Sequence, residues 1–506
     1  MMSSASNPAP RARAEMPWML ITLAVAAALR SVAIFDAFWL DEIWSWAWAH
    51  HPLIYVENLA ALKIESALDI FTKLRHDNNH QLITLWMYLV GDLDQWSIYR
   101  LPSMLAGLGT VWLVMERGRG WAGVVLPGGL FATSYLMMVF STEARGYGLA
   151  IFFALLGYRF LERRLRAESP CSAKDSIMFA AIVVLGMSSH FIFAHFFAAA
   201  VLWTVVHPLR SQEPGGSIGR LLRLHGLPVL YISILYFGFI RGMQFGGGTG
   251  AGIGDTLRDV MAWTSGGPNL WWGAALGGAI LVGLAMHGAG RVPNAHNLVF
   301  LVGASLIGPA LPLLLRSLQA EDMTSLLYPR YFLIAVTFVL LFASRGLLRL
   351  FEASGTRHAV ALVITVVLVI GNSVRIARFL QHGRGTYAEA VTFMSKNSID
   401  SAGQLVDFSV GSPVSVRSKM TMLYYRRFLP AGQRVGWVDK PEVHPVASAP
   451  RWLAIPDPWF AERPAKDRHT AKQMLQLPSG ALYRFADEYP FYGPSGFRWQ
   501  IYGRVR

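Results

Sequence analysis

Two adjacent carboxylates, Asp41 and Glu42, follow the first long apolar run of the chain and stand among tryptophans. A charged group at the end of a membrane helix is costly, and it is usually kept for function or tightly paired. Tryptophan suits such an interface because its ring has an apolar body and a polar edge. A carboxylate held there could act as a general base on a substrate carried by a lipid. The alternative is that the two carboxylates form a polar cap that ends a helix.

A second polar group precedes the short apolar segment 81–91. His76 and His80 are spaced i, i+4 and, together with Asp77, could ligate a metal ion. The asparagines between the histidines favour a turn over a continuous helix, which weakens the metal interpretation. The alternative is that these side chains support the site or contact an acceptor.

Three further segments carry ionisable side chains. Glu143 and Arg145 are either an ion pair at a turn, or a pair in which the carboxylate orients an acceptor or a base. His190 is either a hydrogen-bonded interface histidine or a functional one. Arg330, followed by Tyr331, comes after a proline at a predicted helix start, where a phosphate could be held bidentately. Its alternative is to snorkel toward lipid headgroups.

The composition is that of a membrane protein. Of 506 residues, 53% are hydrophobic and 15% are charged, against roughly 25% charged in soluble domains. The net charge of +14 does not require nucleic acid, because most basic residues fall in short loops, where they orient the chain and meet anionic headgroups. The single Cys171 excludes an intramolecular disulfide framework and a cysteine metal cluster. No nucleotide-binding glycine loop occurs in a suitable setting.

Apolar runs of near-spanning length recur as far as residue 378, which predicts an all-α polytopic membrane domain with about eleven transmembrane helices. The candidate spans are 18–38, 97–115, 121–140, 146–162, 176–189, 191–207, 226–241, 270–287, 298–316, 331–344 and 358–378. Every second loop is basic, so the positive-inside rule places the N-terminus in the cytoplasm. The loops predicted to face outside are 39–96, 141–145, 188–191, 242–269 and 317–330.

This topology brings the candidate groups to one level outside the membrane, and Arg100, near the start of its span, lies at the same level. We therefore expect acidic, histidine and arginine side chains from distant segments to converge there. Segment 81–91 is too short to cross a hydrocarbon core of about 30 Å, so it is predicted to lie in the outer interface or to dip in and return. Other surface helices are expected near 43–50 and 66–76.

Beyond the last span the apolar runs shorten and turn residues become frequent. We predict a membrane domain over residues 1–379 and a small α/β domain over residues 380–506, on the outer side. Helices are expected at Tyr387 to Lys396 and at Val416 to Phe428. Strands are expected at 404–410, 452–455, 481–485 and 497–502.

The order of the motifs resembles that of the GT-C glycosyltransferases, and more narrowly the polyprenyl-phosphate-sugar-dependent branch of the protein O-mannosyltransferase and aminoarabinose-transferase type. The motifs are LDEIWSW, HDNNH, YRLPSMLAGL, STEARGYGLAIF, SSHF and YPRYFL, and they cover roughly residues 18 to 380. In that family a carboxylate follows the first span, and it corresponds to Asp41 with Glu42 beside it. The second acidic position corresponds to Glu143, and the arginine that meets the lipid phosphate corresponds to Arg330.

The resemblance implies transfer of a sugar from a polyprenyl-phosphate donor by an inverting displacement. Asp41 would take a proton from the acceptor, while Arg330, with Arg145 or His190, would stabilise the leaving phosphate. The remaining candidates for acceptor contact or support are His76, Asp77, His80, Arg100 and Tyr331. A divalent metal is possible. The acceptor could be a protein, a glycan or another lipid, and many relatives carry a His/Lys-Pro-Pro segment where this chain has Asn78 to Gln81.

The composition points to a bacterial inner membrane, with the active site and the C-terminal domain in the periplasm and undecaprenyl as the lipid. Two other functions are compatible with polar groups in a helical bundle. A lipid-linked glycan polymerase or ligase handles similar substrates at the same face. A transporter or flippase would more typically place ionisable groups at the midplane on broken helices related by a repeat, and no repeat is visible here. A purely structural scaffold would not require carboxylates among tryptophans.

Overall fold

The computed structural model describes residues 9–50, 64–76, 79–167, 169–207, 215–243, 252–268, 270–290, 295–310, 328–413, 415–457 and 472–505. The chain separates into two compact units. The first comprises the residues up to Ile34, Ile70–Trp86 and Ser97–Ile376. The second comprises Phe35–Asp69, Met87–Trp96 and the residues from Ala377 onward. The second unit therefore combines the predicted C-terminal domain with two segments of the predicted first outer loop.

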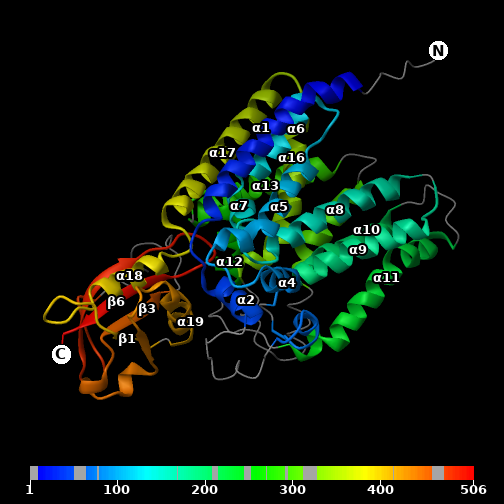
Figure 1. The fold of residues 1–506 in the computed structure, drawn as a ribbon. Helices are drawn as coiled ribbons and strands as arrows, with labels where there is room; N and C mark the ends of the chain where they lie inside the picture. The colour runs from blue at the N-terminus through cyan, green and yellow to red at the C-terminus, as the bar shows by residue number, and fades with distance from the viewer. Residues whose placement is uncertain are drawn as a thin grey trace, which may run out of the picture. The chain divides into compact units, whose positions relative to one another are not determined.

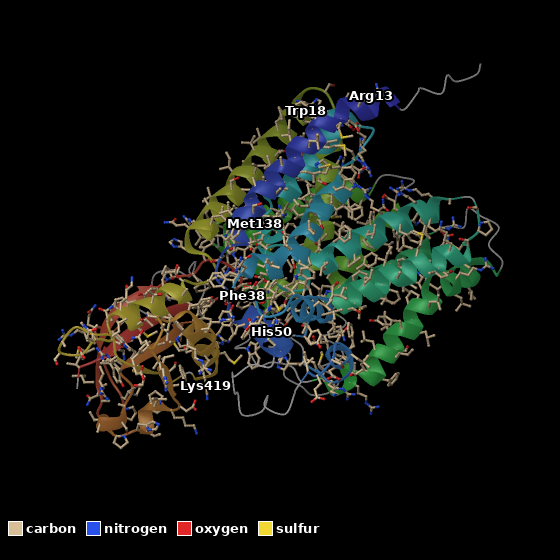
Figure 2. All side chains as sticks on the ribbon, in the orientation of Figure 1. Arg13, Trp18, Phe38, His50, Met138 and Lys419 are labelled. Carbon is tan, nitrogen blue, oxygen red and sulfur yellow. The ribbon has the colours of Figure 1, made fainter. Side chains whose placement is uncertain are left out.

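The first unit is helical (Figure 1). Its helices are α1 (Ala9–Ala33), α5 (Trp96–Val114), α6 (Gly120–Thr133), α7 (Tyr135–Phe140), α8 (Tyr147–Arg166), α9 (Ala173–Ser189), α10 (Phe193–Val206), α11 (Gly216–Gly238), α12 (Ile253–Ser265), α13 (Trp271–Ala289), α14 (Ala295–Val302), α16 (Leu333–Glu352) and most of α17 (Thr356–His382). Short turns include α3 (Asp69–Thr72) and a 3-10 turn at Pro329–Phe332, and α4 (Gln81–Val90) runs from the first unit into the second. Helix α1 packs along α6, with Arg13 and Trp18 toward one end and Met138 of α7 near the other (Figure 2).

Five helices in the described part of the chain are long and apolar enough to cross a membrane. They lie within Arg13–Ala33, Gly216–Gly242, Trp271–Ala289, Pro329–Glu352 and Thr356–Lys396. This supports the predicted integral membrane protein, while the number of about eleven spans stays a prediction. The Pro329–Glu352 helix is the central one, because 83% of its apolar window is buried, against 28% for the Thr356–Lys396 helix.

Helix α16 packs closely against α13 through two glycines. A Cβ atom at Gly288 would lie 1.9 Å from the carbonyl oxygen of Phe342, and one at Gly346 would lie 2.3 Å from that of Leu284. Small residues that let backbones approach are the usual means of packing helices in a membrane, where the hydrophobic effect between helices is weak. The crossing therefore fixes α16 in the middle of the first unit.

Two predicted spans have different limits from those expected. The first helix ends at Ala33, and not at Phe38, because a turn intervenes before α2 (Leu40–His50). The span predicted at 121–140 is two helices, α6 and α7, separated at Ser134, whose backbone is extended. The freed amide of Tyr135 donates to Asn372 Oδ1 at 2.9 Å, so a side chain from α17 satisfies the break.

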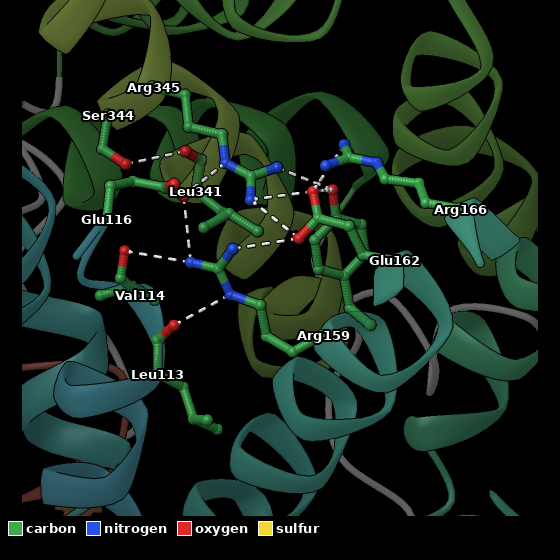
Figure 3. A network of polar contacts seen from close by, with 10 residues as sticks. Leu113, Val114, Glu116, Arg159, Glu162, Arg166, Leu341, Ser344 and Arg345 are labelled. Atoms are coloured by element: carbon green, nitrogen blue, oxygen red, sulfur yellow. Dashed lines mark hydrogen bonds and ion pairs between the residues drawn. The ribbon is translucent and has the colours of Figure 1, made fainter. Parts of the chain in front are cut away.

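A buried ion network joins the turn after α5 to α8 and α16 (Figure 3). The Arg345 guanidinium donates to Glu116 at 2.8 Å and to Glu162 at 3.2 Å, and Arg159 donates to both carboxylates at 3.0 Å. Glu116 therefore accepts from two guanidinium groups and Glu162 from three, because Arg166 also donates to Glu162 at 3.2 Å. Such pairing is the condition under which buried charges are tolerated. These residues lie at the helix ends that the charge pattern assigns to the cytoplasm.

The second unit contains a six-stranded sheet with strand order β2-β1-β3-β6-β5-β4. Its elements are α2, α18 (Tyr387–Lys396), β1 (Phe408–Gly411), α19 (Ser415–Tyr425) followed by a 3-10 turn at Arg426–Phe428, β2 (Val435–Val438), β3 (Trp452–Asp457), β4 (Met474–Gln476), β5 (Leu482–Tyr489) and β6 (Arg498–Arg504). Strand β1 is parallel to β2 and β3, and the other pairs are antiparallel. The buried side chains of Tyr387, Leu453 and Trp499 belong to its core.

The predicted helix at Tyr387 to Lys396 is confirmed, and the predicted α/β character is correct. Strands β2 and β4, at the two edges of the sheet, were not predicted. Both are short and neither has a fully buried residue, and three or four residues are too few to show the periodicity that indicates a strand.

The ion network generates a stability prediction. Burial alone would raise the pKa of Glu116, but the guanidinium groups of Arg345 and Arg159 lower that pKa from 4.5 to about 2. A pKa lowered by folding stabilises the fold above pH 4.5, and this contribution is lost as the pH falls toward 2. We expect Glu116→Gln to cost roughly 2 kcal/mol, and thermal melting in detergent should show the same loss at pH 8 and at pH 5.5.

The matched control is Glu352→Gln, which breaks an ion pair with Arg119 in which both side chains are more than one third exposed. An exposed pair contributes less than about 1 kcal/mol. Equal destabilisation by the two substitutions would contradict the role assigned to the Glu116 network.

Candidate functional site

His80 is held at the start of α4 by backbone contacts. Its carbonyl accepts from the amides of Ile83 at 2.8 Å and Thr84 at 2.9 Å, so it opens the helix. The preceding Asn79 donates its side-chain amide to the carbonyls of Ile70 at 2.8 Å and Leu74 at 2.9 Å. These bonds satisfy backbone carbonyl groups in the turn before α4. The side chain of His80 is buried.

Arg145 donates to His80 from two nitrogens. Its Nε lies 2.9 Å and its Nη2 lies 2.8 Å from His80 Nε2. A guanidinium has no acceptor, so Nε2 must carry no proton. The ring also hydrogen-bonds the backbone of Ser189, which requires the proton on Nδ1. The tautomer of His80 is thus fixed by Arg145 on one side and Ser189 on the other.

Gly146 allows this close packing. A Cβ atom at Gly146 would lie 1.7 Å from the carbonyl oxygen of Ser189 and 3.4 Å from the Cβ of His80. Any side chain there would push apart the turn that carries Arg145 and the backbone that bonds His80. The glycine is therefore needed for close approach of two backbones.

His190 follows α9, and its ring contacts the rings of both His80 and Tyr147, which also contact each other with centroids 5.6 Å apart. The ring centroids are 4.6 Å from His80 and 4.2 Å from Tyr147. The Nδ1 of His190 accepts from the amide of Ile192 at 3.1 Å, so the neutral ring carries its proton on Nε2. Tyr331 approaches from another segment, with its ring 6.5 Å from that of His190.

Arg330 completes this group, which we call the His80 cluster: His80, Arg145, Tyr147, His190, Tyr328, Arg330 and Tyr331. The Arg330 guanidinium carbon lies 4.8 Å from the ring centre of Tyr328 and 5.6 Å from that of Tyr331. Arg145 lies 4.9 Å from Tyr147 in the same way. Contacts of this kind attract a guanidinium to the ring and hold it in a defined position.

The charges of the cluster keep its histidines neutral. His80 and His190 lie in turns outside the spanning helices. Burial first, and then the nearby charges of Arg145 and Arg330, lower the pKa of both rings well below 6.5. At neutral pH the cluster therefore combines charged guanidinium groups with neutral imidazoles that can donate or accept in fixed directions.

The other predicted residues of the first unit have different surroundings. Arg100 is fully buried and donates to the carbonyl of Ile34 at 3.1 Å, at the end of α1, which is a structural contact. Glu143 is fully buried in the turn that carries Arg145. His76 is partly buried, and its carbonyl accepts from Asn79. Asp77 lies outside the described residues.

Asp41 and Glu42 belong to the second unit, in the first turn of α2. Glu42 is fully buried, and its Oε2 accepts from the amide of Trp39 at 3.3 Å. This is half of a capping box, in which the third helical residue reaches back to the residue before the helix. Glu42 therefore caps the start of α2, whereas the simpler alternative expected a cap that ends a helix. Asp41 is partly buried one residue earlier.

Two residues of the cluster had no predicted role. Tyr147 and Tyr328 stood within the quoted motifs, but an aromatic residue in a membrane sequence is common, and its spacing does not indicate which ring lies against which charge. Their adjacency to Arg145 and Arg330 in sequence is the signal that could have identified them. Among the described residues no three His, Cys, Asp or Glu side chains are grouped to hold a metal ion.

No family model matches the sequence, and no curated protein matches it. Solved structures are similar to it in fold, among them ArnT from Cupriavidus metallidurans in the apo state, with a TM-score of 0.50 at 13% identity over 84% of this chain and 87% of that one. The arabinofuranosyltransferase AftD from Mycobacteria has a TM-score of 0.45 at 13% identity over 96% of this chain and 40% of its own. The Archaeoglobus fulgidus oligosaccharyltransferase, in complex with zinc and sulfate, has a TM-score of 0.36 at 11% identity over 87% and 68%.

The likeness to ArnT extends over most of both chains, so it shows a common fold despite the low identity. This chain has a helical part with apolar helices and a small C-terminal sheet, as the sequence predicted. The chain therefore has the GT-C fold that the order of its motifs indicated.

Proposed function

We propose that the protein is an integral-membrane glycosyltransferase that moves a sugar from a polyprenyl-phosphate donor to an acceptor by inverting displacement. A fold hosts several functions, so the proposal depends on the site. The observation that carries it is the His80 cluster, which places Arg145 and Arg330 among aromatic rings and neutral histidines. Guanidinium groups held in place by their neighbours are suited to bind a phosphate. The aromatic rings are suited to pack against the sugar or the lipid beside that phosphate.

The chemistry of the donor explains two arginines. A sugar joined to a polyprenyl phosphate is a phosphodiester with one negative charge. When the bond between the anomeric carbon and the phosphate oxygen breaks, a second charge develops on the leaving phosphate. Arg145 and Arg330 would stabilise this charge, and His190 could donate from Nε2 without changing its own charge. Binding that strengthens as charge develops accelerates the reaction.

Asp41 is the base in this proposal. Its carboxylate would accept the proton of the acceptor hydroxyl or amine as that group attacks the anomeric carbon. Glu42 is already engaged with the amide of Trp39, so its role is to hold the first turn of α2. Glu143, buried in the turn of Arg145, would orient Arg145 or the acceptor.

The orientation is also part of the proposal. The positive-inside pattern supports a site and C-terminal domain in the periplasm of a bacterial inner membrane, with undecaprenyl as the lipid. A glycan, a lipid or a protein would be the acceptor.

Asp41→Asn tests the base. We expect kcat to fall by roughly 10² to 10⁴-fold, the usual contribution of a general base, while the affinity for polyprenyl phosphate stays unchanged. Turnover would be measured as transfer of labelled sugar from purified lipid donor, and affinity by titration with polyprenyl phosphate. Asp175→Asn, in the first turn of α9, is the matched control and should keep full activity. Full activity of Asp41→Asn would contradict the assignment.

Arg330→Gln tests the phosphate site. Loss of a hydrogen bond to a charged group costs about 1.5–3 kcal/mol, so we expect affinity for polyprenyl phosphate to fall by about 10 to 100-fold. Arg117→Gln is the control, because Arg117 also lies over an aromatic ring, that of Trp112 at 5.0 Å, in a loop with no proposed role. If the Arg330→Gln variant and the wild type bind polyprenyl phosphate equally well, the phosphate does not bind at Arg330.

Gly146→Ala tests the packing of the cluster without removing a charge. The added methyl group collides with the Ser189 carbonyl, so His80 and Arg145 must separate. We expect weaker polyprenyl phosphate binding in a protein that still folds, as judged by its elution from a sizing column. Gly129→Ala adds the same methyl group where nothing lies within 4 Å, and it should bind as the wild type does. If both variants bind equally well, the cluster does not hold the ligand.

A further inference from the structure

We propose that Arg427 is a positioning residue that, together with Tyr424 and Tyr425, holds α2 and thereby aims Asp41. This inference deepens the proposed function and rests on it for the role of Asp41. All of its contacts lie within the second unit. They attach the turn before α2, α2 itself and the segment after α4 to the end of α19.

The turn that precedes α2 is bonded at two places. Asp36 accepts from the amide of Arg384 at 2.9 Å, and its carboxylate lies 3.6 Å from the fully buried Arg384 guanidinium. Gly383 permits this contact, since a Cβ there would lie 2.5 Å from the Asp36 carboxylate. Two residues further on, the carbonyl of Phe38 accepts from the hydroxyl of Tyr425 at 2.7 Å.

Aromatic contacts hold the body of α2. Phe38 lies just before the helix and His50 ends it (Figure 2). The ring of Phe38 stacks on Tyr424 at 6.0 Å, and Trp46, in the second turn of α2, meets the edge of Tyr424 at 4.9 Å. Such pairs stabilise beyond the area that they bury.

Arg427 connects these contacts to a third segment. Its guanidinium carbon lies 5.0 Å from the ring centre of Trp46. Its nitrogens donate to Asp92 at 2.9 Å and Asp94 at 2.7 Å. Asp92 in turn accepts from the indole of Trp46 at 3.1 Å. One guanidinium therefore joins α2 to the segment that follows α4.

These contacts determine the position of Asp41, because α2 is too short to hold its own direction. A helix of 11 residues is marginal by itself, so its direction comes from what it packs against. Asp41 stands between the two attachment points, the Phe38 carbonyl before it and Trp46 after it. A change at either point rotates or shifts the first turn. Misplacement of a catalytic group by about 1 Å can cost a hundredfold in rate.

The experiment uses the full-length protein with Arg427→Gln. We expect the amides of α2 to exchange hydrogen faster in mass-spectrometric measurements, and kcat to fall about 10 to 100-fold with the affinity for polyprenyl phosphate unchanged. Arg427→Lys keeps the charge and loses the planar fork, so it should recover part of the rate. Tyr425→Phe, which removes only the bond to Phe38, should raise exchange in the same helix.

Arg498→Gln is the matched control. Arg498 pairs with Glu488 at 2.9 Å in the sheet of the same unit, and both ion pairs are partly exposed. It should leave α2 exchange and kcat unchanged. Unaltered exchange in α2 of the Arg427 and Tyr425 variants, or faster exchange with unaltered kcat, overturns the proposal. Absence of transfer by the wild-type protein would instead overturn the proposed function, and the exchange data would still decide whether Arg427 holds α2.

Discussion

The pair of hydrogen bonds from Arg145 to His80 Nε2 constrains everything around it. A guanidinium can only donate, so the bonds exist only while the imidazole is neutral at that nitrogen. They also hold His80 against the Ser189 backbone, and Gly146 is the residue that makes the approach possible. The ring of His190 then contacts a ring whose position and protonation are already fixed. The cluster is thus organised before any ligand arrives, which reduces the reorganisation that binding would otherwise require.

The two buried polar regions of the first unit differ in the partners of their arginines. In the Glu116 network, Arg159 and Arg345 each donate to two carboxylates, and the bonds join three segments of backbone. In the His80 cluster, the arginines lie against tyrosine and histidine rings. Carboxylate partners neutralise a guanidinium and favour a structural role. Aromatic rings also hold a guanidinium in a defined position.

Much of this could be predicted from the sequence. The alternation of basic loops placed His80, Arg145, His190 and Arg330 at one level, and the structure brings these four side chains together. The apolar runs gave most helices, and the parallel and antiparallel strands of the C-terminal part were largely found. These features depend on residue composition and on the periodicity of apolar residues, and both can be read from a single segment of the sequence.

Other features depend on contacts between distant segments, and the sequence could not supply them. Glu42 accepts from the Trp39 amide at the start of α2, and the pattern of residues does not show where that amide lies. The break at Ser134 depends on Asn372, far along the chain. The inclusion of α2 in the second unit depends on side chains of α19 that no local pattern links to it.

Helix α16 carries polar anchors at both of its ends. Arg330, in the turn that leads into it, and Arg345, near its other end, are separated by roughly 22 Å along the axis, at 1.5 Å per residue. That separation is shorter than a hydrocarbon core of about 30 Å. Sliding the helix along its axis would separate Arg345 from Glu116 and Glu162. The glycine crossing with α13 blocks the same movement from the side. Helix α16 is therefore held against movement along its axis as well as sideways, and the helices packed around it keep a fixed register on it.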